Sequence, residues 1–193
     1  MGHVDHGKSS ILDKIRGTAI VESEPGRITQ SIGASIVTID VIKNIAGSLL
    51  EMLKIELTIP GLLFIDTPGH AAFTNLRKRG GNLADIAILV IDIQEGMMPQ
   101  TLESLEILKT YKTPFIIALN KIDLIQGWQE REGTVLQRLM AQSPNIQAIL
   151  DQKLYELVGK LSEKGFNSER FDRVEDFTKQ IAIVPCSAKT GEG

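Results

Sequence analysis

One short segment at the start of the chain limits the folds open to it more than any other. Residues 2–9 read Gly-His-Val-Asp-His-Gly-Lys-Ser and match the pattern G-x-x-x-x-G-K-[ST]. In such a loop the glycines let successive backbone N–H groups point inward at an anion. The side chain of Lys8 then reaches phosphate oxygens, and the Ser9 hydroxyl ligates Mg²⁺. The segment therefore predicts a nucleotide-phosphate site at the positive N-terminal end of a helix over 9–16.

The same residues could also form a turn without a ligand, and the loop lies unusually close to the start of the chain. A glycine-rich turn before a helix would give the same residues without any ligand, an alternative that the later motifs disfavour. A phosphate loop normally follows a strand, but only Met1 precedes Gly2. We therefore expect the fold to lack its first strand.

The composition is that of one soluble globular domain. The 193 residues are 42% hydrophobic and 23% charged, and the formal net charge is −3. Any nucleic-acid contact must therefore come from a local patch or from another domain. The single Cys186 excludes an internal disulfide framework and fits a reducing cytosol. The sequence shows neither a targeting signal nor an apolar run of 18 residues, so we expect a cytoplasmic protein that makes no membrane contact.

Apolar runs and hydrophobic periodicity predict an alternation of strands and helices. Strands are expected over 36–43, 61–66, 86–92, 114–119 and 181–185. Further helices are expected near 45–54, before Arg79, from Pro99 onward and over 127–180, with a polar loop over 18–35. This order predicts an α/β fold with a mostly parallel, doubly wound sheet. Ligands of such sheets bind beyond the carboxyl ends of the strands, which is where each motif lies.

Polar residues after two of these strands supply the chemistry that a nucleotide site needs. Asp66 can hold Mg²⁺, and the backbone N–H of Gly69 suits a γ-phosphate. Asn120 and Asp123 supply base recognition, since a carboxylate accepts both N–H donors of the guanine edge, a pair that adenine lacks. Lys121 has an aliphatic stem that can lie along the base. These residues favour GTP over ATP.

Four motifs, in this order, resemble the signature set of P-loop GTPases: Gly2–Ser9, Asp66–Gly69, Asn120–Asp123 and Ser187–Lys189. The histidines of the first motif, and His70 after the second, narrow the resemblance to translational GTPases. The segment Ile28–Ala34 is similar to switch I of the initiation GTPases that promote ribosomal subunit joining. This is the family of bacterial initiation factor two and archaeal-eukaryotic initiation factor five-B. The insertions near 43–60 and over 127–180 look like its archaeal branch.

The resemblance implies roles that the residues alone leave open. Thr29 would ligate Mg²⁺ and sense the γ-phosphate, and His70 would orient the attacking water. Val4 and Ile28 would gate that histidine, and Asp5 would lie near a monovalent cation. The Ser187–Ala188 backbone would bind the guanine carbonyl, with Lys189 nearby.

These assignments define three overlapping sets of site residues. The catalytic set is His70, Lys8, Thr29 and Gly69, and the metal set is Ser9, Thr29 and Asp66. The nucleotide set is Val4, Asp5, His6, Gly7, Lys8, Ser9, Ser10, Asp66, Gly69, Asn120, Lys121, Asp123, Ser187, Ala188 and Lys189. A capping or surface role is the alternative for His70, and a structural role is the favoured interpretation of the His3 and His6 side chains.

The chain departs from the family pattern in a few places. Pro25-Gly26-Arg27 stands where a Gly-Gly pair is expected before switch I, and Ser9 replaces the commoner threonine. Compared with the family pattern, we expect the chain to lack the first strand, the last helix and all later domains. We therefore expect residues 1–193 to be one GTP-binding domain, truncated at both ends, that is poorly stable alone because two strands lose ladder partners.

The expected function is a GTP-binding and GTP-hydrolysing switch of translation initiation, with GTP or GDP and Mg²⁺ as its ligands. The implied partners are the large ribosomal subunit, initiator tRNA and other initiation factors, reached through domains absent here. One alternative is a nucleotide-binding scaffold without useful hydrolysis, and another is a translational GTPase of the elongation-factor type. Arg77-Lys78-Arg79 can contact rRNA, although a solvated helix face is the favoured interpretation.

Overall fold

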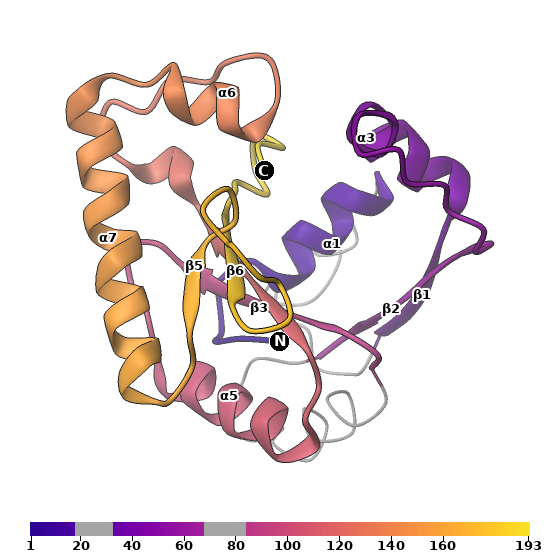
Figure 1. Ribbon diagram of the computed structural model, residues 1–193, viewed down its shortest axis with the longest axis horizontal. Helices are drawn as coiled ribbons and strands as arrows, with labels where there is room; N and C mark the ends of the chain where they lie inside the picture. The colour runs from indigo at the N-terminus through magenta and orange to yellow at the C-terminus, as the bar shows by residue number, and fades with distance from the viewer. Residues whose placement is uncertain (18–32, 68–83) are drawn as a thin grey trace.

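The computed structural model describes residues 1–17, 33–67 and 84–193 (Figure 1). Its central element is a parallel sheet in the order β3-β4-β6-β5. The strands are β3 (Ala87–Asp92), β4 (Phe115–Asn120), β5 (Ser168–Arg170) and β6 (Ile181–Pro185). A separate antiparallel pair consists of β1 (Gly33–Thr38) and β2 (Gly61–Asp66). The predicted α/β class with a mostly parallel sheet is confirmed.

Helices cover the sheet on both sides. In Figure 1, α7 (Pro144–Glu163) lies on one side of the parallel sheet and α1 (Lys8–Arg16) on the other. The remaining helical elements are α3 (Ile39–Met52), α5 (Pro99–Tyr111), the 3₁₀ turn η3 (Ile122–Leu124) and α6 (Val135–Met140). None of the helices in the described ranges is long and apolar enough to span a membrane.

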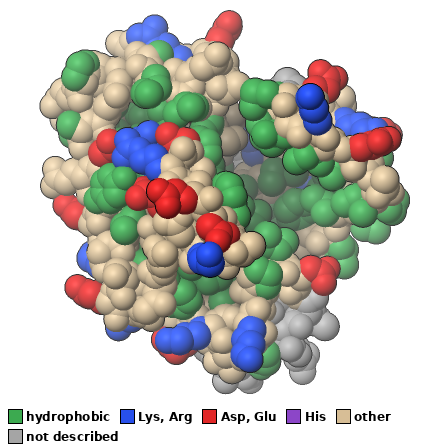
Figure 2. Space-filling model, in the orientation of Figure 1, with side chains coloured by type: hydrophobic (Ala, Val, Ile, Leu, Met, Phe, Trp, Pro, Cys, Tyr) green, Lys and Arg blue, Asp and Glu red, His purple; other side chains and the backbone are tan. Residues whose placement is uncertain are grey.

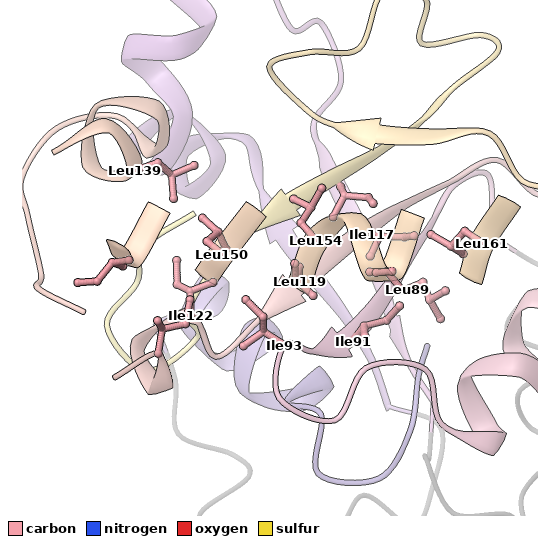
Figure 3. Close-up of a cluster of buried hydrophobic side chains, with 14 of the residues drawn as sticks. Leu89, Ile91, Ile93, Ile117, Leu119, Ile122, Leu139, Leu150, Leu154 and Leu161 are labelled. Atoms are coloured by element: carbon pink, nitrogen blue, oxygen red, sulfur yellow. The ribbon is translucent and has the colours of Figure 1, made fainter. Parts of the chain in front are cut away.

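The core lies between α7 and the parallel sheet. Figure 3 shows Leu150, Leu154 and Leu161 of α7 beside strand residues that include Leu89 and Ile117, all of them buried. The spacing of the α7 residues by three and four positions places them on one helix face. This apolar face of α7, which lies within the helical region predicted over 127–180, therefore packs the core.

The strand predictions fail at β1 and at β5. Residues 33–35, predicted as part of the loop over 18–35, already belong to β1. The predicted strands over 61–66 and 181–185 coincide with β2 and β6, but the predicted strand over 36–43 is wrong beyond Thr38. There the β1 ladder ends, with Thr38 opposite Gly61, and α3 begins at the next residue. The described half-buried positions of α3 are Ile39, Val41, Ile42, Ala46, Gly47 and Leu50, and four of them, Ile39, Ile42, Ala46 and Leu50, are spaced by three and four. Their spacing of three and four follows the helical period, which outweighs the short β-branched run.

The helical insertion predicted over 127–180 is also shorter than expected. Its helices occupy only Val135–Met140 and Pro144–Glu163, and β5 then adds an edge strand parallel to β6. The change of structure follows Gly165, whose φ of 82° is a left-handed conformation that ends a helix. Residues 168–170 alternate between buried and half-buried, as in a strand.

A buried ion-pair network attaches α7 to β5. Arg170, only 6% exposed, donates two hydrogen bonds to the carboxylate of Asp172, at 2.6 and 2.9 Å, and one to Asp151 of α7 at 2.8 Å. Hydrogen bonding to Arg170 outweighs partial burial and holds the pKa of Asp172 below its usual value. Acidic and basic side chains gather over α7 and β5 in Figure 2.

Replacing Arg170 by methionine is expected to lower the free energy of unfolding by about 3 kcal/mol. Asp172 then loses its ion-pair partner, and Asp151 keeps only the longer pair with Arg173 at 3.4 Å. Thermal and urea unfolding of the complete protein would measure the change. Lys179→Met is the matched control, since Lys179 forms an exposed pair with Asp176 and should have no measurable effect. Equal effects of the two substitutions would contradict a special role for the buried network.

Candidate functional site

The phosphate-loop segment starts against β3. The carbonyl of Met1 accepts a hydrogen bond from the Val90 N–H at 2.8 Å, and Gly2 forms a parallel bridge with Val90. A Cβ on Gly2 would lie 2.3 Å from the Val90 carbonyl oxygen, so only glycine fits this approach. The loop therefore leaves the sheet at the carboxyl-terminal half of β3.

The far end of the loop is joined to β4. Gly7, with φ of 91°, is the N-cap of α1, and its carbonyl accepts the first helical hydrogen bond from Ile11. The side-chain amide of Asn120, which is only 1% exposed, donates to the carbonyl of His6 at 2.9 Å. The predicted phosphate loop and the predicted base-recognition residue thus lie in direct contact.

Ser9 and Asp66 converge from different elements. The Ser9 hydroxyl in the first turn of α1 donates to Asp66 Oδ2, at the end of β2, at 2.5 Å. The Lys8 ammonium donates to the His3 carbonyl within the same loop at 2.5 Å. A hydroxyl and a carboxylate are hard oxygen ligands of the kind that Mg²⁺ prefers.

This pair of oxygen donors fits a Mg²⁺ ion that is bound mainly through a nucleotide. Within the described ranges, no group of three or more His, Cys, Asp and Glu side chains is arranged to hold a metal. Mg²⁺ sites at phosphates use one or two protein ligands and complete the shell with water and phosphate oxygens. Ser9 and Asp66 therefore fit the protein side of such a site, and Thr29 stays a predicted third ligand.

The base-recognition residues form a second hydrogen-bonded group at the ends of β4 and β6. Asn120 Oδ1 accepts a hydrogen bond from the Ala188 N–H at 3.0 Å. The Ser187 hydroxyl donates to Asp123 Oδ1 at 2.6 Å, which fixes the orientation of that carboxylate. Lys189 follows in the same loop and is exposed. The structure thus brings together the two motifs that the sequence predicts at the base, although they lie more than 60 residues apart.

The side chain of His6 points away from this surface into the protein. It is fully buried, and its Nδ1 accepts a hydrogen bond from the Asp92 N–H at 3.2 Å. Nδ1 also lies 3.4 Å from the Val90 carbonyl, but the Asp92 N–H is the nearer partner and can only donate. We therefore assign the ring proton to Nε2, which donates to Glu95 at 3.0 Å. Burial lowers the pKa of His6 more than Glu95 raises it, which favours the neutral ring.

The sequence interpretation did not include Asp92 in the site. This residue ends β3, and its carboxylate pairs with the Lys121 ammonium at 2.7 Å. Its position at the carboxyl end of a buried strand is the signal that already selected Asp66 and Asn120. The same signal applied to β3 would have found it.

Several predicted site residues lie outside the described ranges. These are Thr29, Gly69 and His70, together with Ile28 and the basic segment 77–79. Val4 and Asp5 lie in the described loop, where Asp5 is exposed with φ of 60°. Ser10 is exposed on α1. The monovalent cation near Asp5 stays a prediction.

Solved structures of translation factors resemble this fold over the whole chain. The crystal structure of GDP-bound aIF5B from Aeropyrum pernix superposes with a TM-score of 0.82 at 56% sequence identity, and the match covers 100% of this chain and 32% of that one. A bacterial selenocysteine-specific elongation factor, EF-Sec, gives a TM-score of 0.62 at 25% identity, with 100% and 25% of the two chains covered. The likeness therefore includes both the fold and, for aIF5B, most of the sequence.

Curated relatives of similar sequence are also translation factors. A probable translation initiation factor IF-2 of Methanopyrus kandleri is 62% identical, and one of Sulfolobus acidocaldarius is 59% identical. Each match covers all of this chain and 32% of the relative, so the chain spans about a third of the length of these proteins. Residues 1–193 match the family described as the elongation factor Tu GTP binding domain. The chain therefore belongs to this family of GTP-binding domains.

Proposed function

We propose that residues 1–193 form the GTP-binding domain of a translation initiation GTPase. The observation that carries the proposal is the contact between four separated motifs at one edge of the fold. Ser9 contacts Asp66 at the phosphate end, and Asn120 joins the phosphate loop to the base-recognition group of Asp123 and Ser187. The names of the relatives support initiation over elongation, because the initiation factors are 59–62% identical and the elongation factor EF-Sec only 25%.

In this proposal each end of the site has its own chemistry. Lys8 and the loop N–H groups bind the phosphates of GTP or GDP, while Ser9 and Asp66 contribute ligands to Mg²⁺. The carboxylate of Asp123 accepts the two N–H donors of the guanine edge, and Ser187 holds it in that orientation. GTP supplies the transferable γ-phosphoryl group, and the protein contributes positioning and charge stabilisation.

The hydrolytic step is assigned to Thr29 of switch I and to Gly69 and His70 at the end of the motif that begins at Asp66. Thr29 and Gly69 respond to the γ-phosphate, and His70 orients the attacking water when the factor is bound to the ribosome. The complete protein acts in the cytoplasm, where it contacts the large ribosomal subunit, initiator tRNA and other initiation factors and promotes subunit joining. A scaffold that binds nucleotide without hydrolysing it is the second candidate, and phosphate release separates the two.

The proposal is tested with the complete protein, purified with and without His70→Ala. We expect tight binding of fluorescent mant-GDP and mant-GTP but not of adenine analogues. Phosphate release should be slow alone, on the order of 10⁻⁴ s⁻¹, and much faster with ribosomes. His70→Ala should remove at least about 100-fold of that stimulation while leaving both dissociation constants within twofold of wild type.

Three outcomes would contradict parts of the proposal. Equal affinity for guanine and adenine nucleotides would overturn the assignment of the site. Saturable GTP binding without phosphate release, even with ribosomes, would favour the scaffold. Full stimulation in His70→Ala would remove that histidine from the mechanism.

A further inference from the structure

The pairing of β3 with β4 brings a carboxylate next to the lysine of the base-recognition motif. Asp92 and Asn120 are register partners at the ends of these parallel strands. Lys121, the next residue, adopts a left-handed conformation with φ of 67°. Its ammonium is thereby 2.7 Å from Asp92 Oδ2.

Asp92 is itself held in place by hydrogen bonds to the Gln94 backbone and to the His6 ring. The residue is 3% exposed, its Oδ1 accepts the Gln94 N–H at 2.7 Å, and its own N–H donates to the buried His6 ring at 3.2 Å. Burial tends to raise the pKa of Asp92, but hydrogen bonds from Lys121 and Gln94 outweigh it and lower the pKa. The carboxylate is thus charged and fixed, while the side chain of Lys121 is 31% exposed.

Fixing one end of a lysine side chain changes what its stem can do. A lysine side chain has several rotatable bonds, and a ligand that packs against it must restrict them at a cost in affinity. The ion pair with Asp92 removes much of that freedom before any ligand arrives. It also compensates the positive charge, so that the aliphatic stem is the part presented to a planar ring.

We propose that Asp92 is a positioning residue for guanine-nucleotide binding, which acts by holding the stem of Lys121 in the orientation that packs along the base. The inference rests on the proposed function, in which this site binds GTP and GDP. Because Asp92 acts at the base end, its loss weakens GDP and GTP binding to the same extent. A residue at the phosphate end would separate the two nucleotides.

The test is a double-mutant cycle on nucleotide affinity in the complete protein. Asp92→Asn removes the charge but keeps an oxygen that can accept the Gln94 N–H. It should raise the dissociation constants of mant-GDP and mant-GTP by about tenfold each, the effect of freeing one long side chain. In a Lys121→Met background the same substitution should change them by less than about twofold, because the group through which it acts is gone. A purely structural role would give equal effects in both backgrounds.

Controls distinguish failure of this inference from loss of folding and from failure of the proposed function. Asp176→Asn, which removes a carboxylate paired with Lys179 in an exposed loop, should leave both dissociation constants unchanged. If Asp92→Asn does not give a cooperative melt, Asp92→Thr replaces it in the cycle, and loss of folding in both variants overturns the inference. Wild-type affinity in Asp92→Asn, or additivity with Lys121→Met, also overturns it while the proposed function stands. Wild-type protein without a preference for guanine would instead overturn the proposed function.

Discussion

Replacing Asp123 by asparagine is expected to lower the affinity of the complete protein for guanine nucleotides at least about a thousandfold. A carboxylate offers acceptors to both the ring N–H and the exocyclic amino group of guanine, whereas an amide offers one acceptor and one donor. A site built to accept two hydrogen bonds discriminates strongly against a mismatched partner, since buried polar groups are then unpaired. Xanthine carries a carbonyl where guanine carries the amino group, so xanthosine nucleotides should bind the variant more tightly than wild type.

In the environment of Asp123, the substitution by asparagine changes the hydrogen-bonding groups and leaves the size of the side chain the same. Asparagine has the same size, and its amide oxygen can accept the Ser187 hydroxyl that now bonds to Asp123 at 2.6 Å. The amide nitrogen is then the atom left for the base. Ser187→Ala is the matched variant, because it frees the carboxylate without changing its acceptors. It should weaken guanine binding about fivefold without any gain for xanthine.

Competition of GDP, xanthosine diphosphate and ADP against mant-GDP would measure both variants. Unchanged GDP affinity in Asp123→Asn would show that the carboxylate does not recognise the base. A similar gain of xanthine binding in Ser187→Ala would show that displacement, and not the exchange of an acceptor for a donor, causes the effect.

The sequence could predict those parts of the fold and site that depend only on residue type and on neighbouring residues. The strands β2 and β6 are short apolar runs bounded by turn residues, and their bounds were predicted as observed. The contact of Ser9 with Asp66 also followed from sequence, since each residue lies at an element end that faces the same edge of the fold. Such features depend on the type of each residue and on its immediate neighbours.

Features that depend on pairing between distant strands could not be predicted in the same way. The strand predicted over 36–43 ends at Thr38, where its ladder with the partner strand ends opposite Gly61 and the helical period of α3 takes over. Likewise, Asp92 reaches Lys121 only because β3 and β4 pair in a register that places Asp92 opposite Asn120. A shift of that register by one residue would turn Asp92 to the other face of the sheet. Periodicity within one segment contains no information on such a register.

The substitution Gly7→Ala should abolish useful nucleotide binding, with at least about a 100-fold rise in the dissociation constants of GDP and GTP. Gly7 has φ of 91°, and a Cβ there would lie 2.2 Å from the Asn120 side-chain nitrogen. That nitrogen donates to the His6 carbonyl, so the methyl group displaces the hydrogen bond that joins the phosphate loop to β4. Left-handed strain of about 1–2 kcal/mol and a lost buried hydrogen bond of about 1–3 kcal/mol both act on the loop whose N–H groups bind the phosphates.

The other end of the same helix supplies the control. Gly17 is the C-cap of α1 with φ of 67°, and nothing lies within 4 Å of a Cβ built on it. Gly17→Ala should therefore cost about 1 kcal/mol of stability through strain alone and leave nucleotide affinity unchanged. Calorimetric titration of both variants with GDP, beside their thermal unfolding without nucleotide, separates the two effects. If Gly7→Ala binds GDP as tightly as Gly17→Ala, the loop tolerates a side chain at its closest approach to Asn120. The contact between loop and β4 would then have no part in holding the phosphates.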